Sequence, residues 1–177
     1  MIVSKIGVHG LGGGPVVLGN VGKWVNATPP TNLPLGYIAI WRWVESPDSW
    51  NDKMGGNPES EAQNWISKQW SHIQNVPKSV WIEGPNEGNC ENLIQAQWVS
   101  RFELRRMQII ENLGWKCCVG NFGTGRPPLP VNDLEGIPVW TALLPMLRYA
   151  KMNGHILGLH EYSYTLDTWH MLRYRRV

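Results

Sequence analysis

The chain has 177 residues, of which 42% are hydrophobic and 17% are charged, and its formal net charge is +2. This length and apolar content suffice for one sizeable core, so residues 1–177 are expected to form a single domain. The small net charge gives no basic stripe for nucleic acid, and no run approaches the roughly 20 apolar residues of a membrane span. Neither nucleic acid nor a membrane is therefore an expected partner.

Cysteine usage and the N-terminal sequence say little about location. The three cysteines, Cys90 and the adjacent Cys117 and Cys118, fit neither a disulfide framework nor a zinc spacing. The first residues, MIVSKI, lack the apolar region of a signal peptide. A reducing compartment is the default, the localisation stays open, and no cofactor or metal is expected. Eleven tryptophans should lie mostly in the core, although sugar-binding clefts also present tryptophan faces.

The N-terminal third predicts three short strands, at residues 5–9, 24–28 and 37–41. The first runs into the glycine-rich segment 10–15, whose spacing fits neither the P-loop nor the dinucleotide fingerprint. The third strand delivers Arg42 to its end. An arginine there can orient a carboxylate or a sugar hydroxyl, or it can form a structural ion pair.

From residue 38 onward, strands and helices alternate with no hairpin signal. Strands are predicted at residues 79–82, 116–120 and 155–159, and helices at residues 59–75, 91–113 and 138–152, followed by an amphipathic segment at 168–177. Strand starts near residues 38, 80, 117 and 156 give a period of about forty residues. This is the pattern of βα units on a parallel sheet.

Two polar clusters follow predicted strands. Asn86 and Glu87 come after the strand at 79–82, and the sequence His160-Glu161-Tyr162 comes after the strand at 155–159. On its own, Glu87 could simply decorate a turn. Polar residues at several strand ends favour a barrel over an open doubly wound sheet, because barrel enzymes carry their catalytic groups there.

A strand followed by Asn-Glu and, two βα units later, a strand followed by His-x-Tyr resembles the (β/α)8 glycoside hydrolases of the large retaining clan. The resemblance implies an α/β fold of (β/α)8 TIM-barrel type, incomplete, with about six strands present and the last two βα units missing. It implies that Glu87 is the catalytic acid/base and that Asn86 binds the sugar 2-hydroxyl. His160, Tyr162 and Arg42 would also contact the substrate.

The chain departs from the clan in three respects. The usual Asn-Glu-Pro is Asn86-Glu87-Gly88 here, and only 26 residues between Gly10 and Tyr37 are available for the second strand and its helices. The clan's nucleophilic glutamate is expected beyond residue 177, so the chain is expected to be a fragment that is inactive alone. Within the chain, the alternative second carboxylates are Glu83, expected in a buried structural pair, and Glu161, expected to point to the opposite face.

The sequence therefore predicts a glycoside hydrolase-like protein that assists hydrolysis of O-glycosidic bonds in a poly- or oligosaccharide. One alternative is a non-catalytic carbohydrate-binding barrel that keeps only the fold. Another is a metal-dependent α/β enzyme using His160 and Glu161, although the chain has no HExxH motif. The sugar, the linkage, the stereochemical outcome and the oligomeric state stay open.

Overall fold

The computed structural model describes residues 8–11, 21–44, 54–87, 90–128 and 136–160. The elements are β1 (Val8–Leu11), β2 (Val21–Val25), β3 (Ile38–Arg42), α1 (Pro58–Ile73), β4 (Val80–Glu83), α2 (Leu93–Asn112), β5 (Lys116–Phe122), α3 (Gly136–Asn153) and β6 (Ile156–Leu159). Every neighbouring pair of strands is parallel, and the spatial order follows the chain from β1 to β6. The predicted βα units on a parallel sheet are confirmed. The predicted amphipathic segment at 168–177 lies outside the described residues.

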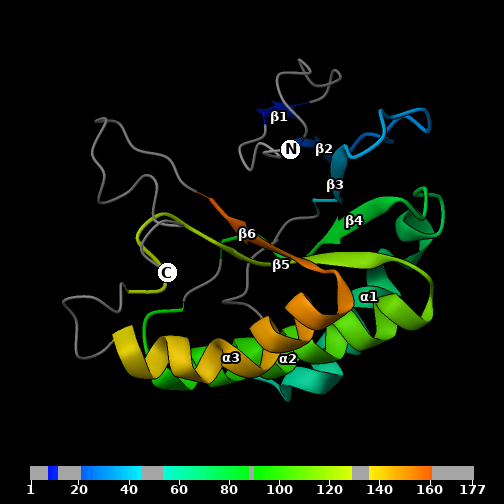
Figure 1. The fold of residues 1–177 in the computed structure, drawn as a ribbon. Coiled ribbons are helices and arrows are strands. Elements are labelled where there is room, and N and C mark those ends of the chain that lie inside the picture. The colour runs from blue at the N-terminus through cyan, green and yellow to red at the C-terminus, as the bar shows by residue number, and fades with distance from the viewer. Residues whose placement is uncertain (1–7, 12–20, 45–53, 88–89, 129–135, 161–177) are drawn as a thin grey trace.

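The predicted barrel is wrong. Strands β2–β6, whose side chains are described, form one curled half-barrel sheet to which the short β1 adds at the β2 edge. In the described part of the chain, β1 and β6 do not pair with each other, and α1, α2 and α3 lie together on one face of the sheet (Figure 1). Residues 26–37, which connect β2 to β3, contain three prolines and no helix, so no complete βα unit forms there.

The helices begin where local hydrogen bonds favour them. The side chain of Asn57 accepts a hydrogen bond from the backbone N–H of Ser60 at 3.0 Å, and Pro58 occupies the first turn of α1. In α2 the same role falls to Asn92, which accepts from the Gln95 N–H at 3.0 Å. Both helices therefore have fixed N-termini at the edge of the sheet where β3 and β4 end.

The apolar faces of the helices cover the sheet to form the core. Ala62, Trp65, Ile66 and Ile73 of α1 are buried as their helical spacing predicts. The same spacing predicted burial for four residues that the structure exposes: Trp70 at 37%, Leu93 at 43%, Leu113 at 38% and Leu144 at 37%. Leu93 is the first residue of α2 and Leu113 is its C-cap, so both lie at the ends of the helix.

A buried ion pair joins α2 to the sheet. Arg106 and Glu103 are fully buried, and Arg106 Nε lies 2.7 Å from Glu103 Oε2. The guanidinium also donates to the backbone carbonyls of Ile82 in β4 at 3.1 Å and Cys118 in β5 at 2.8 Å. Glu103 Oε1 accepts from the Gly120 N–H at 3.0 Å. The pair thus fixes the carboxyl ends of β4 and β5 relative to the helix layer.

Within the described residues, no helix combines the length and the apolar character that crossing a membrane requires.

Candidate active site at the carboxyl edge of the sheet

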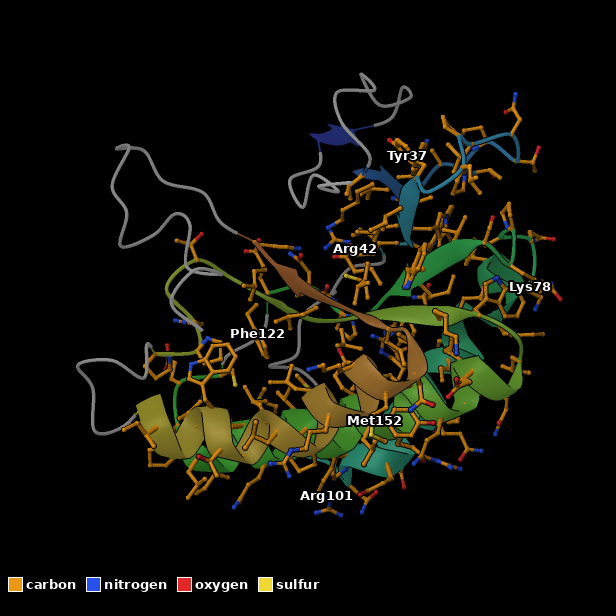
Figure 2. The ribbon with its side chains drawn as sticks, viewed as in Figure 1. Tyr37, Arg42, Lys78, Arg101, Phe122 and Met152 are labelled. Atoms are coloured by element: carbon orange, nitrogen blue, oxygen red, sulfur yellow. The ribbon has the colours of Figure 1, made fainter. Side chains whose placement is uncertain are left out.

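Four strands bring charged side chains to one place. Lys23 comes from β2, Arg42 and Glu83 are the last residues of β3 and β4, and His160 follows β6. Trp24 and Trp41, which alternate with them in β2 and β3, belong to the core. Side chains alternate across a strand, so Lys23 and Arg42 lie on the opposite face of the sheet from the helices. Arg42 is labelled on this side in Figure 2.

Glu83 is the buried centre of the group, with only 1% of its surface exposed. Its Oε1 accepts from Lys23 Nζ at 2.7 Å and from Arg42 Nη1 at 3.2 Å, and His160 Nε2 lies 3.3 Å away. Burial alone would raise the pKa of Glu83, but the contact with His160 and the charges of Lys23 and Arg42 outweigh it and lower the pKa to about 2. Glu83 is therefore an ionised structural anchor.

Arg42 links this anchor to the loop after β4. Its Nη1 donates both to Glu83 and to the side-chain oxygen of Asn86. Of the two roles predicted for Arg42, the ion pair at a strand end is present, and contact with a sugar hydroxyl stays a prediction. Arg42 also fixes the amide of Asn86 beside Glu87.

Glu87 is held in an unusual backbone conformation. Its φ is +26°, a backbone conformation that residues other than glycine rarely adopt. Its N–H donates to the carbonyl of Asn121 in β5 at 3.1 Å, and its Oε1 lies 2.6 Å from His160 Nδ1. A Cβ at Gly123 would lie 3.5–3.6 Å from the Glu87 side chain, an ordinary contact distance, so Gly123 lies directly against this side chain. Backbone strain of this kind concentrates at functional sites.

His160 is positioned by β5 as well. Its N–H donates to the carbonyl of Phe122 at 2.8 Å, and its own carbonyl accepts from Thr124 Oγ1 at 2.9 Å. Consecutive carbonyls of β5, those of Asn121 and Phe122, thus hold Glu87 on the β4 side and His160 on the β6 side. The spacing of the carboxylate and the imidazole is set by the main chain.

The structure brings together four of the five predicted site residues: Arg42, Asn86, Glu87 and His160. Tyr162, and with it Glu161, lies outside the described residues. Glu83 lies in a buried ion pair, in agreement with the role expected for it. Lys23 was missed because the predicted second strand began at Trp24. The signal that could have found it is the lone cation in the run Val21-Gly-Lys-Trp-Val25.

Two other features bear on ligands. In the part of the chain that the structure describes, no group of three or more His, Cys, Asp and Glu side chains is arranged to hold a metal ion. A pocket of about 120 Å³ is lined by Trp41, Trp43 and His72 among others, with Trp43 stacked on His72. Trp41 and Trp43 flank Arg42 in the chain and face the other side of β3, so the pocket does not extend the charged site.

No protein-family model matches this chain, and no curated protein and no solved structure matches it either. Its function must therefore be argued from the chemistry of the site.

Proposed function

We propose that the chain is glycoside hydrolase-like and that Glu87 transfers the proton in the hydrolysis of an O-glycosidic bond of a poly- or oligosaccharide. The observation that carries the proposal is the contact of 2.6 Å between Glu87 Oε1 and His160 Nδ1, formed by a carboxyl in a strained backbone conformation at a sheet edge. A carboxyl held in one orientation by a ring nitrogen is suited to general acid/base catalysis.

The neighbouring groups support a polyhydroxylated substrate. Arg42 donates a hydrogen bond to the amide oxygen of Asn86. This bond fixes the orientation of the amide, whose NH2 group is the side-chain donor next to Glu87 in the chain. Amides and carboxylates side by side can accept from and donate to the hydroxyls of a sugar ring. The Glu87 side chain is 28% exposed and the His160 side chain 18%, so a ligand can reach both.

Glu83 is unsuited to be the second carboxylate. In a retaining glycosidase the two carboxyl groups face the substrate about 5–5.5 Å apart. Glu83 is 1% exposed, and its Oε1 is bound by two cations. The ring of His160 lies between Glu83 and Glu87, contacting both. Glu83 therefore contributes charge and position, and a water or another carboxylate must supply the nucleophile.

This position of Glu83 also favours a second candidate, a protein that binds carbohydrate without cleaving it. Glu83, which contacts His160 on the side away from Glu87, is held by Lys23 and Arg42 and is not placed as a paired catalytic carboxylate would be. A binding protein needs only the fixed polar groups of Asn86, Glu87 and His160. The two candidates differ in whether a bound glycan yields a new reducing end.

The test uses the 177-residue chain with a panel of soluble polysaccharides, scored for binding by calorimetry and for hydrolysis by reducing ends. Glu87→Gln should lower hydrolysis of a natural glycan by about 100-fold or more and leave binding within a few-fold. The matched control is Glu91→Gln, which removes a carboxylate four residues along that pairs with Arg126, and it should retain hydrolysis.

The outcomes separate the candidates. Undiminished hydrolysis in Glu87→Gln would refute the role of Glu87. Saturable binding without any product would favour the non-catalytic candidate, and neither binding nor hydrolysis across the panel would count against both.

A further inference from the structure

His155 joins the start of β6 to the neighbouring strand. Its side chain is fully buried, and its Nδ1 accepts a hydrogen bond from the backbone N–H of Cys117 in β5 at 2.9 Å. A backbone N–H can only donate, so Nδ1 carries no proton and the proton of the neutral ring lies on Nε2. Nδ1 is therefore the atom at which a second proton must bind.

A proton on Nδ1 is incompatible with this contact. It would bring two donors, the ring and the Cys117 N–H, to face each other across 2.9 Å with no acceptor between them. The other ring nitrogen offers no compensation: among the described residues, Nε2 has no hydrogen-bond partner. It lies 3.8 Å from Glu111 Oε2, which accepts from the hydroxyl of Tyr149 at 2.8 Å. The protonated ring fits only if His155 and Cys117 separate.

The surroundings of the ring also disfavour its charged form. Burial lowers the pKa of His155 to about 4, and the charge of Glu111, which favours the protonated ring, does not offset this effect. The pKa returns towards 6.5 when the ring is exposed to water, so acid favours an open form. The charged and titratable groups that act on the ring or touch it are Glu111 and Arg106 of α2, Lys116 and Cys117 of β5, and Tyr149 of α3, whose ring stacks on that of His155.

β6 is an edge strand, and among the described strands it pairs with β5 alone. It connects His155 at one end to His160 at the other, where the His160 N–H donates to the carbonyl of Phe122 at 2.8 Å. Its pairing with β5 is irregular between Gly120 and Phe122. Loss of the Cys117 contact therefore leaves a strand of four residues whose attachment is already interrupted.

We propose that His155 is a pH-sensitive switch: protonation of its ring at Nδ1 breaks the contact with the Cys117 N–H and releases β6 from β5, which separates His160 from Glu87. The strands from β2 to β5 and the helices that cover them stay folded during this release. The candidate site is thus assembled near neutral pH and taken apart by acid. This regulation goes beyond the proposed function, because it follows from the attachment of β6 and does not require a substrate.

Amide hydrogen exchange of the 15N-labelled full chain tests the proposal. Protection of the Cys117 and His160 N–H groups, corrected for the intrinsic rate at each pH, should fall about tenfold per pH unit from about pH 6.5 to 4, or about 300-fold in all. Dilute urea should leave this exchange nearly unchanged, because the release of a short strand exposes little surface. The Ile82 N–H in β4 should be more protected at every pH and should respond to urea.

Two variants identify the titrating group. His155→Asn places a side-chain oxygen where it can accept from the Cys117 N–H without titrating, so it should keep the protection seen at pH 7 and remove the loss in acid. His72→Asn, in the last turn of α1, is the matched control and should lose protection in acid as the wild-type chain does.

Protection of Cys117 that does not change with pH would overturn the proposal, and so would an undiminished loss in His155→Asn. Loss at Cys117 without loss at His160 would overturn the link to the candidate site. If His155→Asn does not fold, the wild-type chain decides: exchange of Cys117 and His160 as sensitive to urea as that of Ile82 would show that acid unfolds the whole chain, and would overturn the release of β6.

Discussion

Replacing Arg106 by methionine should remove a large part of the free energy of unfolding. The substitution keeps most of the apolar volume but deletes the contacts to Glu103 Oε2 and to the carbonyls of Ile82 and Cys118. Glu103 is fully buried, so its carboxylate would be left without its cation. Removing one member of such a pair costs about 3–5 kcal/mol, against a total of about 5–15 kcal/mol for a typical domain.

A double-mutant cycle separates the pair from the packing. Glu103→Gln alone leaves the Arg106 charge unpaired and should cost about 2–3 kcal/mol, whereas the amide oxygen can still accept from Gly120. In the double variant neither charge remains. Its loss of stability should therefore fall short of the sum of the two single losses by about 2 kcal/mol.

Urea unfolding followed by tryptophan fluorescence measures all three free energies. The control is Arg101→Met, which breaks the ion pair of Arg101 with Glu59 at the surface, where both side chains are 40% exposed or more. That loss should stay below about 1 kcal/mol. A loss below about 1 kcal/mol for Arg106→Met, or losses that simply add in the double variant, would refute the argument that this pair fixes β4 and β5 to α2.

Two further predictions concern acid and a glycine. Burial lowers the pKa of His155 from its usual 6.5 to about 4, and the pKa of Glu83 is lowered from 4.5 to about 2. Both groups therefore bind fewer protons in the folded chain than in the unfolded chain between about pH 6.5 and 2. The free energy of unfolding should fall as the pH falls from about 6.5 to 4 for His155 and from about 4.5 to 2 for Glu83, by at most about 3 kcal/mol for each group. Urea midpoints that stay constant from pH 7 to 4 would contradict the prediction for His155. Gly120→Ala should cost more than about 1 kcal/mol in the same assay, because φ is +85° and the new Cβ would lie 2.8 Å from Phe122 and 2.9 Å from Leu157. Gly55→Ala, where nothing lies within 4 Å, is the matched control, and equal losses in both would refute the steric argument.

From residue 38 onward, the sequence was sufficient to predict the elements and the edge of the sheet at which the candidate site lies. Strands such as Ile38–Arg42 and Val80–Glu83 are continuous apolar runs that end at polar residues, which is typical of buried parallel strands. Because parallel strands end at one edge, Arg42 and Glu87 could be expected to lie close to each other. The helices followed from their 3.6-residue periodicity, although their end residues did not pack as expected.

Sheet closure and the central contacts of the site could not be predicted. Closure depends on a complete βα unit in every connection, and the proline-rich residues 26–37 provide no helix. The role of Lys23 depends on which face of β2 it occupies, and a shift of the strand boundary by a few residues concealed it. Nothing local in the sequence indicates that Asn121 and Phe122 would hold two distant loops through their carbonyls.

Those two carbonyls have a consequence for how this site can change over evolutionary time. Glu87 and His160 are held through their own backbone N–H groups, and any residue except proline carries that group. Mutation can therefore exchange either side chain without removing these hydrogen bonds, although the positive φ of Glu87 restricts which residues can replace it. The backbone at this edge of the sheet can therefore keep its structure while the polar side chains on it are replaced one at a time.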